Sequence, residues 1–155
     1  MAELARAVAA LRIVGEDLDP SEITALLGCE PTTAWAKGET RTTHGVTRVM
    51  SFGKWGMEAP ETSPADLDSQ VSAILDRLSP DQGVWSNLAE RYDVDLFCGW
   101  FMERLNEGVS LAPETLASLG ARRIVLDIDL YGAFEADAPE TRSVPAVQKW
   151  WPGRS

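Results

Sequence analysis

The sequence predicts an α+β fold: a ferredoxin-like sheet made of duplicated β-α-β units, with an additional connecting helix and a C-terminal tail. Short apolar segments alternate with short amphipathic helices, and one helical segment recurs later in the chain. Residues 18–28 (LDPSEITALLG) and 111–120 (LAPETLASLG) share a Leu-x-Pro opening, an apolar stripe and a closing glycine. Two such units give the β-α-β-β-α-β plan. A doubly wound sheet is the competing fold, but it needs longer crossover helices.

Length and composition indicate one domain over residues 1–132, followed by a tail over residues 133–155. A chain of 155 residues has the size of a single domain with a core of its own. The two cysteines, Cys29 and Cys98, lie far apart and outside any C-x-x-C spacing. This usage predicts a cytoplasmic protein with reduced thiols.

The charge and hydropathy patterns argue against two classes of partner. Acidic residues outnumber basic ones 24 to 14, which gives a net charge of −10, whereas phosphate binding in nucleic acids needs clustered Lys and Arg. No stretch approaches the ~18 apolar residues of a membrane span. The first residues lack the pattern of a signal peptide. We therefore expect no nucleic-acid partner and no membrane insertion.

The first predicted unit begins with a strand over residues 8–14 (VAALRIV), which is apolar at nearly every position. Asp19 as N-cap, Pro20 at the first helical position and Gly28 after the last turn predict a short helix. Residues 29–47, rich in Thr and Gly, predict a long loop or a loosely paired hairpin.

The middle of the chain supplies a strand and the connecting helices. Residues 49–57 (VMSFGKWGM) predict the strand that closes the first unit. Residues 66–78 carry Leu, Val and Ile at helical spacing. Ser-Pro ends that helix, and residues 82–91 predict one more short helix.

The second unit starts with residues 95–102 (DLFCGWFM), the most apolar stretch of the chain. Residues 112–120 predict its helix, and residues 123–132 alternate in the manner of a half-buried edge strand. Right-handed crossovers place strands one and three side by side in the centre. Both central strands are apolar on their two faces, so we expect both faces to be covered.

Several of these segments resemble a known family. The Pro31-Thr32 and Lys37-Gly38 pairs, Trp55, the strand over residues 93–102, and the Pro-to-Gly helix over residues 113–120 are similar to the bacterial family called domain of unknown function 4279. The likeness covers roughly residues 9–132. It implies a small cytosolic bacterial protein, leaves open a gene position beside toxin or defence systems, and brings no activity, cofactor or catalytic residue.

The loop over residues 33–48 is the one basic, aromatic island in an acidic protein. It carries Trp35, Lys37, Arg41 and His44. Long loops in compact domains often carry function, and these side chains suit an anion or the acidic patch of a partner. An alternative stays open, in which the loop is a hairpin extension whose tryptophan packs on the sheet.

Carboxylates form the second candidate group. Asp127 and Asp129 share one face of the last strand, about 7 Å apart by strand geometry, together with Tyr131. If Asp95 aligns on the same face, three carboxylates gather to bind a cation or a basic partner. The alternative is a solvated edge-strand face that prevents aggregation. No third ligand at a metal-binding spacing is visible, so we predict no metal site.

Cys98 is the obvious residue to examine for catalysis, because it stands between aromatic side chains. A catalytic thiolate needs a nearby base and access to solvent, and His44 is the only histidine. We therefore interpret Cys98 as a buried, inert thiol. The sequence predicts no catalytic residue and no cofactor.

The leading functional hypothesis is a non-enzymatic protein-interaction or binding module, for example an immunity-type protein. Trp150 and Trp151 in the tail suggest that the tail or a second copy of the chain covers one sheet face, so self-association stays open beside a protein partner. The alternative is a small-ligand-binding protein or enzyme, with a pocket between the 33–48 loop and the sheet and His44 as acid–base residue.

Overall fold

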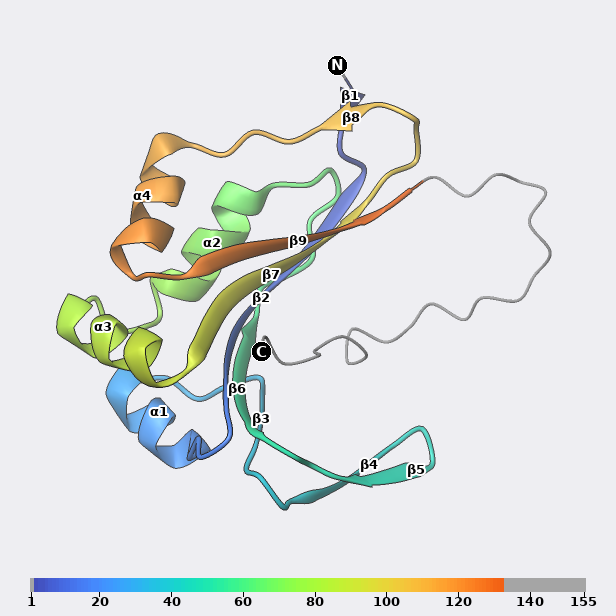
Figure 1. The fold of residues 1–155 in the computed structure, drawn as a ribbon. Coiled ribbons are helices and arrows are strands. Elements are labelled where there is room, and N and C mark those ends of the chain that lie inside the picture. Colours follow the sequence, from blue (N-terminus) through green and yellow to red (C-terminus); the bar gives the residue numbers. More distant parts are fainter. Residues whose placement is uncertain (1, 133–155) are drawn as a thin grey trace.

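The protein has a mixed α+β fold, in which four helices pack on one side of a five-stranded sheet (Figure 1). The structure is a computed structural model that describes residues 2–132. Across the sheet the strands follow the order β3 (Thr33–Trp35), β6 (Gly53–Glu58), β2 (Arg6–Gly15), β7 (Asp93–Phe101) and β9 (Val125–Tyr131).

The two predicted central strands are indeed neighbours in the centre of the sheet. β2 pairs antiparallel with β6 on one side and with β7 on the other, β3 pairs antiparallel with β6, and β7 pairs parallel with β9. β1 (Ala2–Glu3) and β8 (Glu107–Gly108) form a separate parallel pair. The sheet is therefore mixed, with its only parallel pair at one edge of the described strands.

The capping residues predicted the position of α1 (Pro20–Leu27) correctly. Asp19 caps the helix by accepting the N–H of Ser21 at 2.9 Å, and Gly28 ends it with a φ of 75°, a left-handed conformation that glycine adopts without a steric penalty.

The loosely paired hairpin expected within residues 29–47 exists as β4 (Thr40–Thr43) and β5 (Val46–Val49). Figure 1 shows it projecting away from the helices, beyond the edge of the sheet.

The expected ferredoxin-like duplication is not shown, because the two units have different topologies. β7, α4 (Pro113–Ala121) and β9 form a parallel strand–helix–strand crossover, as predicted. The first unit returns antiparallel, and β6 lies directly beside β2. Between α1 and β6 the chain also forms β3 and the β4–β5 hairpin, so β6 enters the sheet after a reversal that a short crossover helix alone would not produce.

The core lies between the sheet and the helices. Alternate residues in the middle of β2 are buried on that side, and α2 (Leu67–Leu75) and α3 (Gln82–Arg91) pack against them. Two tryptophans enter the core with their indole N–H groups paired. Trp55 Nε1 donates to Thr24 Oγ1 at 3.1 Å, and Trp85 Nε1 donates to the Ser79 carbonyl at 2.8 Å. Their large apolar area is thus buried without an unpaired donor.

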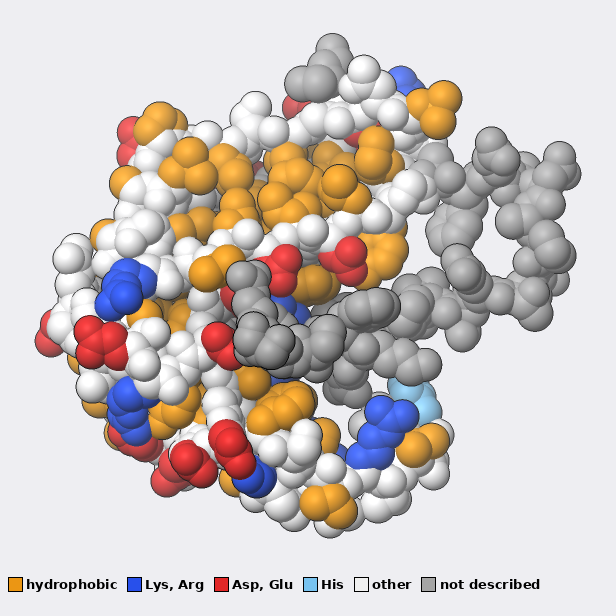
Figure 2. Space-filling view, in the orientation of Figure 1, with side chains coloured by type: hydrophobic (Ala, Val, Ile, Leu, Met, Phe, Trp, Pro, Cys, Tyr) orange, Lys and Arg blue, Asp and Glu red, His pale blue; other side chains and the backbone are white. Residues whose placement is uncertain are grey.

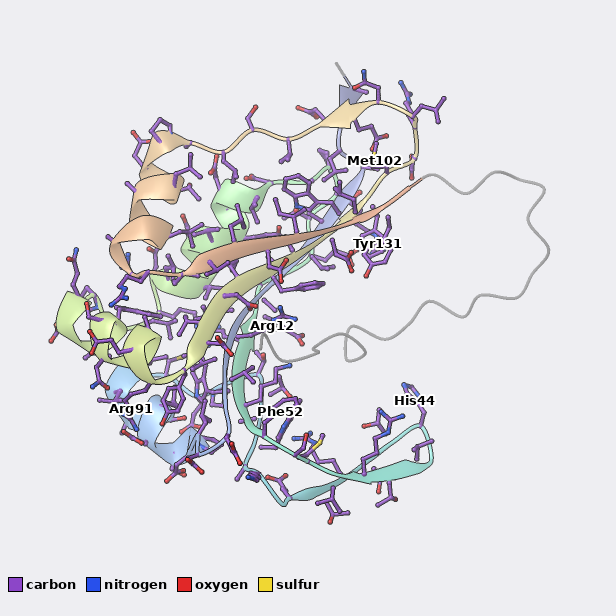
Figure 3. All side chains as sticks on the ribbon, in the orientation of Figure 1. Arg12, His44, Phe52, Arg91, Met102 and Tyr131 are labelled. Atoms are coloured by element: carbon purple, nitrogen blue, oxygen red, sulfur yellow. The ribbon has the colours of Figure 1, made fainter. Side chains whose placement is uncertain are left out.

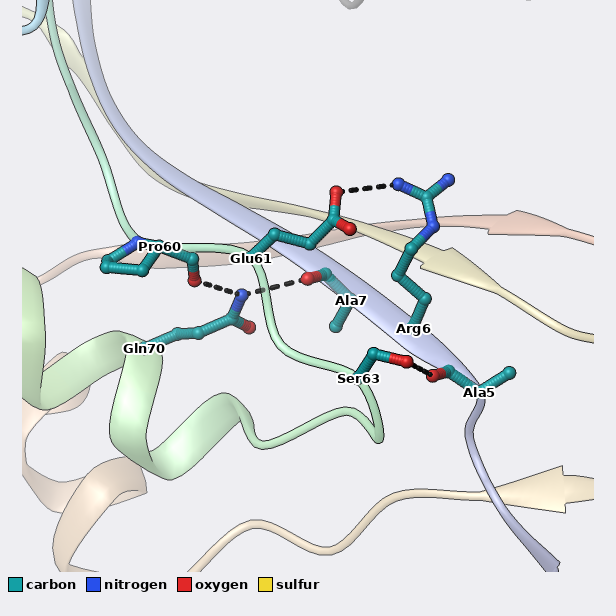
Figure 4. Close-up of polar contacts among 7 residues, drawn as sticks. All are labelled: Ala5, Arg6, Ala7, Pro60, Glu61, Ser63 and Gln70. Atoms are coloured by element: carbon teal, nitrogen blue, oxygen red, sulfur yellow. Dashed lines mark hydrogen bonds and ion pairs between the residues drawn. The ribbon is translucent and has the colours of Figure 1, made fainter.

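A buried glutamine fastens the segment before α2 to β2 (Figure 4). Gln70 Nε2 donates to the carbonyls of Ala7 at 2.9 Å and Pro60 at 3.1 Å. Beside it, Arg6 pairs with Glu61 at 2.8 Å. These contacts fix the first half of β2, which β6 does not reach.

The N-terminus of α4 takes its cap from a different helix. Ala112, at the N-cap position, has no capping side chain of its own. Asp68 of α2 accepts its N–H at 3.1 Å and the hydroxyl of Thr115 at 2.5 Å. The carboxylate thereby satisfies free donors of α4 and joins α2 to α4.

Replacing Asp68 by alanine should lower the free energy of unfolding by about 1–3 kcal/mol, because the α4 donors lose a charged acceptor. Urea denaturation measures this. Asp76→Ala at the other end of α2 serves as the control, with an expected change below about 0.5 kcal/mol. Equal losses at the two positions would contradict the capping role.

Candidate binding face of the sheet

The candidate site is the side of the sheet on which no described helix packs, here called the open face. Strand alternation and register decide which residues share it, because side chains alternate between the two faces of a strand. Arg12, for example, lies opposite Asp95 on the neighbouring strand and opposite Gly56 on the other side. The charged and aromatic members of the open face are Arg6, Arg12, Trp35, Lys54, Glu58, Asp93, Asp95, Phe97, Phe101, Asp127, Asp129 and Tyr131.

A two-pronged ion pair occupies the centre of the open face. Arg12 Nε donates to Asp95 Oδ1 at 2.8 Å and Arg12 Nη2 donates to Asp95 Oδ2 at 2.7 Å. Asp127 Oδ2 lies 3.6 Å from the same Nη2. The guanidinium also stands over the Phe97 ring, 4.5 Å from its centroid. Both paired side chains are nearly buried, at 12% and 10% exposure, so desolvation makes each of them depend on the other.

Asp95 and Asp127 therefore do meet on one face, as the sequence suggested, but an arginine lies between them. Its positive charge offsets the carboxylates, so the group differs from the open carboxylate cluster that a cation would need. Within residues 2–132 no group of three or more His, Cys, Asp or Glu side chains is arranged to hold a metal ion. Sequence reasoning missed Arg12, although a lone arginine inside an apolar strand was a signal that a buried acidic partner exists.

A stack of aromatic rings forms one end of the open face. The Phe101 and Tyr131 rings lie parallel with centroids 4.6 Å apart, and the Arg6 guanidinium covers Phe101 at 3.6 Å. The Tyr131 hydroxyl donates to Asp129 at 2.9 Å. Burial raises the pKa of Tyr131, and the Asp129 carboxylate raises it further. Tyr131 and Asp129 thus act as one polar rim beside an aromatic platform.

A second cation–aromatic group lies where the hairpin joins the sheet. Trp35 is 6% exposed, and its ring meets two cations, Arg41 Cζ and Lys54 Nζ, each 4.9 Å from the centroid. Arg41 Nη1 also donates to the Ala34 carbonyl at 2.6 Å. The structure thus agrees with the second interpretation of the 33–48 loop: the segment forms a hairpin, its tryptophan packs on the sheet, and Arg41 stacks on that tryptophan. The role in binding stays a prediction.

The other two candidates from the loop lie elsewhere. Lys37 forms an ion pair with Glu16. His44 occupies the turn of the hairpin with a φ of 50°, followed by Gly45 at 76°, the two positive φ values of a tight hairpin turn. Figure 3 shows His44 at the tip of the hairpin, apart from Arg12 and Tyr131. The turn geometry accounts for the backbone conformation at His44.

The helix side of β9 carries a different surface. Figure 2 shows hydrophobic side chains gathered between α4 and β9, where Ile128 is 38% and Leu130 is 62% exposed. β9 is an edge strand of the described sheet. Asp127 and Asp129 alternate with these apolar residues, and such charges discourage edge-to-edge association.

Cys98 is buried on the helix side of the sheet, as expected of an inert thiol. Burial raises its pKa to about 12, with smaller contributions from the charges of Asp127 and Asp95. Cys29 is only partly buried. None of the helices within residues 2–132 is long and apolar enough to cross a membrane. Trp150 and Trp151 lie outside the described residues.

Removing one partner of the Arg12–Asp95 ion pair should lower the free energy of unfolding more than removing both partners. We expect Arg12→Met to lower the free energy of unfolding by about 3–5 kcal/mol, because it leaves Asp95 nearly buried and unpaired. The double variant Arg12→Met/Asp95→Leu should lose less than Arg12→Met alone, which urea denaturation can measure. Arg91→Met, which breaks an exposed pair with Glu22, is the control and should cost at most about 1 kcal/mol. The single variant Asp95→Leu completes the double-mutant cycle. If the loss of unfolding free energy in the double variant equalled the sum of the losses in the two single variants, the pair would not be coupled.

The cysteines should react at different rates. At pH 8 iodoacetamide should modify Cys29 in the folded protein and leave Cys98 unmodified, because a thiol with a raised pKa supplies almost no thiolate. Peptide mass spectrometry reads out each site, and modification of both cysteines in denaturant is the control. Rapid labelling of native Cys98 would show that it is neither buried nor inert.

Comparison with known proteins adds a family. A family model described as Domain of unknown function (DUF4279) matches residues 4–133, which takes in the sheet, the four helices and every described residue of the open face. No curated protein and no solved structure matches the chain.

Proposed function

Since the chain belongs to the DUF4279 family, a membership that assigns no activity, we propose from the geometry that it is a non-enzymatic interaction module whose open face binds a segment of a protein partner. One observation carries this proposal. Cations stacked on aromatic rings run across the face from Trp35 on β3 to Phe101 on β7, on the side where no described helix packs.

The residue types support an interface more than a catalytic centre. Arginine and aromatic side chains are enriched in the centres of protein interfaces, where their large rigid surfaces bind with little loss of entropy. Arg6 and Arg12 are held over their rings by Glu61 and Asp95 respectively. Because these side chains are already ordered, a partner would lose less conformational entropy on binding them.

The shape favours a protein segment as the partner. The β4–β5 hairpin projects on the open side beyond the sheet edge (Figure 1), so an extended segment laid along the sheet would reach the hairpin as well. The net charge of −10 disfavours nucleic acid as the alternative. A second copy of the chain is a further alternative, which the experiment below separates from a different protein.

Site-specific photo-crosslinking tests the proposal. A benzoylphenylalanine is placed at Tyr131 on the open face and, in the control, at Leu116 on the helix side, which is 50% exposed. In cells that naturally contain the protein, we expect an adduct with one partner from Tyr131 and none from Leu116. Mass spectrometry then identifies the partner and the crosslinked segment.

Binding of the purified partner must then depend on the aromatic platform of the open face. We expect Tyr131→Ala to weaken binding at least about tenfold, because it removes one ring of the stack with Phe101, while Leu116→Ala on the helix side leaves binding unchanged. Equal adducts from both crosslinker positions would overturn the proposal. So would an adduct that contains only a second copy of this chain, because it would identify self-association instead.

A further inference from the structure

Lys54 is a partly buried lysine on the open face whose ammonium group has no hydrogen-bond acceptor among residues 2–132. It lies on β6, opposite Trp35 on one neighbouring strand and Val14 on the other. Its side chain is partly buried, and Nζ rests on the Trp35 ring. Within residues 2–132 it donates no hydrogen bond and forms no ion pair, although an ammonium has three donors to satisfy.

Burial and neighbouring cations disfavour the protonated form of Lys54. Burial lowers the pKa of Lys54, the positive charge of Arg12 lowers it further, and Arg41 adds a smaller effect in the same direction. The carboxylates of Glu58 and Asp95 act in the opposite sense without offsetting burial. Perturbed lysines of this kind cluster at functional sites, so the position is a candidate for ligand contact together with the geometry at Trp35.

A second donor in the same cluster also lacks an acceptor. The indole Nε1 of Trp35 is buried and has no hydrogen-bond partner among the described residues. Arg41, stacked on the same ring, uses Nη1 for the Ala34 carbonyl, while its nearest carboxylate oxygen, on Glu39, is 4.0 Å away. Three donor groups therefore gather at the hairpin end of the open face, and two of them, the Lys54 ammonium and the Trp35 indole, have no acceptor among the described residues.

We propose that Lys54 is the anchor for a carboxylate carried by the bound protein segment, with Arg41 as a supporting donor. This inference rests on the proposed function and adds that the partner segment is acidic. A carboxylate over Lys54 would supply the missing acceptor and counter the charge of the neighbouring cations. A carboxylate fits better than a phosphate, because Asp95 and Glu58 nearby would repel a doubly charged group more strongly.

If Lys54 is kept for binding and not for stability, removing its charge should stabilise the unbound protein. In the folded state the pKa of Lys54 lies below its value in the unfolded chain, so the folded state holds this proton less tightly. The cost is fully present below the folded pKa and disappears as pH rises toward the unfolded value. Methionine retains a long apolar side chain that packs on Trp35. We expect Lys54→Met to raise the Tm by roughly 2–4 °C at pH 7, with a gain that shrinks at alkaline pH.

Binding is tested on the full-length protein with defined probes. The probes are a blocked hexapeptide of alternating glutamate and alanine, the same peptide with glutamine, and inorganic phosphate. Nitrogen-15 NMR follows the Trp35 indole and the Lys54 ammonium. We expect the glutamate peptide alone to shift both signals and to raise the pKa of Lys54.

Two lysine variants separate anchoring from general charge. Lys54→Met should weaken binding of the glutamate peptide at least tenfold while the protein stays folded and becomes more stable. Lys37→Met, which removes an exposed lysine of equal charge, should leave binding unchanged. Equal binding of the glutamate and glutamine peptides, equal binding of phosphate, or undiminished binding by Lys54→Met would each overturn the inference.

The two proposals fail in different ways. If the Tyr131 crosslink forms with a partner but the glutamate peptide does not bind, the open face is an interface and the carboxylate anchor is wrong. If the crosslinking fails as well, the proposed function itself is wrong.

Discussion

The ion pair between Arg12 and Asp95 is the constraint around which the open face is built. It joins β2 to β7 through two residues that are 83 positions apart in the chain. Because both side chains are nearly buried, neither is tolerable alone, and the register of the central strands is fixed by charge as well as by the apolar residues on their other side. Asp127 and Phe97 both contact the same guanidinium. The pairing register of β2 and β7 is thus set by an ion pair on one face of the sheet and by apolar packing on the other.

Much of the fold could be predicted because its signals are local. Asp19, Pro20 and Gly28 mark the ends of α1 by capping chemistry that acts within a few residues, and the predicted helix over residues 82–91 coincides with α3. The adjacency of the two central strands was predicted from the crossovers of a ferredoxin-like plan, and their apolar composition agreed with it. Strand direction did not: residues 29–52 add β3 and a hairpin, and a repeat seen in two helices carries no information about how the chain returns to the sheet.

The candidate site was predictable in its parts but not in its assembly. Trp35, Arg41, Asp95, Asp127, Asp129 and Tyr131 lie on or beside the open face, whereas Lys37 and His44 have local partners or turn geometry that explain them. Arg12 and Lys54 lie on the same face, between the loop residues and the carboxylates, but neither was predicted as a site residue. Each stands in a strand that was recognised by its apolar residues. Their importance depends on cross-strand register, which residue spacing within one strand does not contain.

The position of β2 also has a consequence for how the molecule forms. Among the five strands of the sheet, β2 comes earliest in the chain and lies in the middle, and its partners are residues 53–58 and 93–101. Until the later partner is synthesised, one complete edge of an apolar strand stays unpaired. Such non-local pairing is slow, because the intervening loop must close before any contact compensates for the lost chain entropy. A charge within such a strand, as Arg12 is in β2, disfavours pairing with a wrong neighbour, because no acidic partner would then offset it.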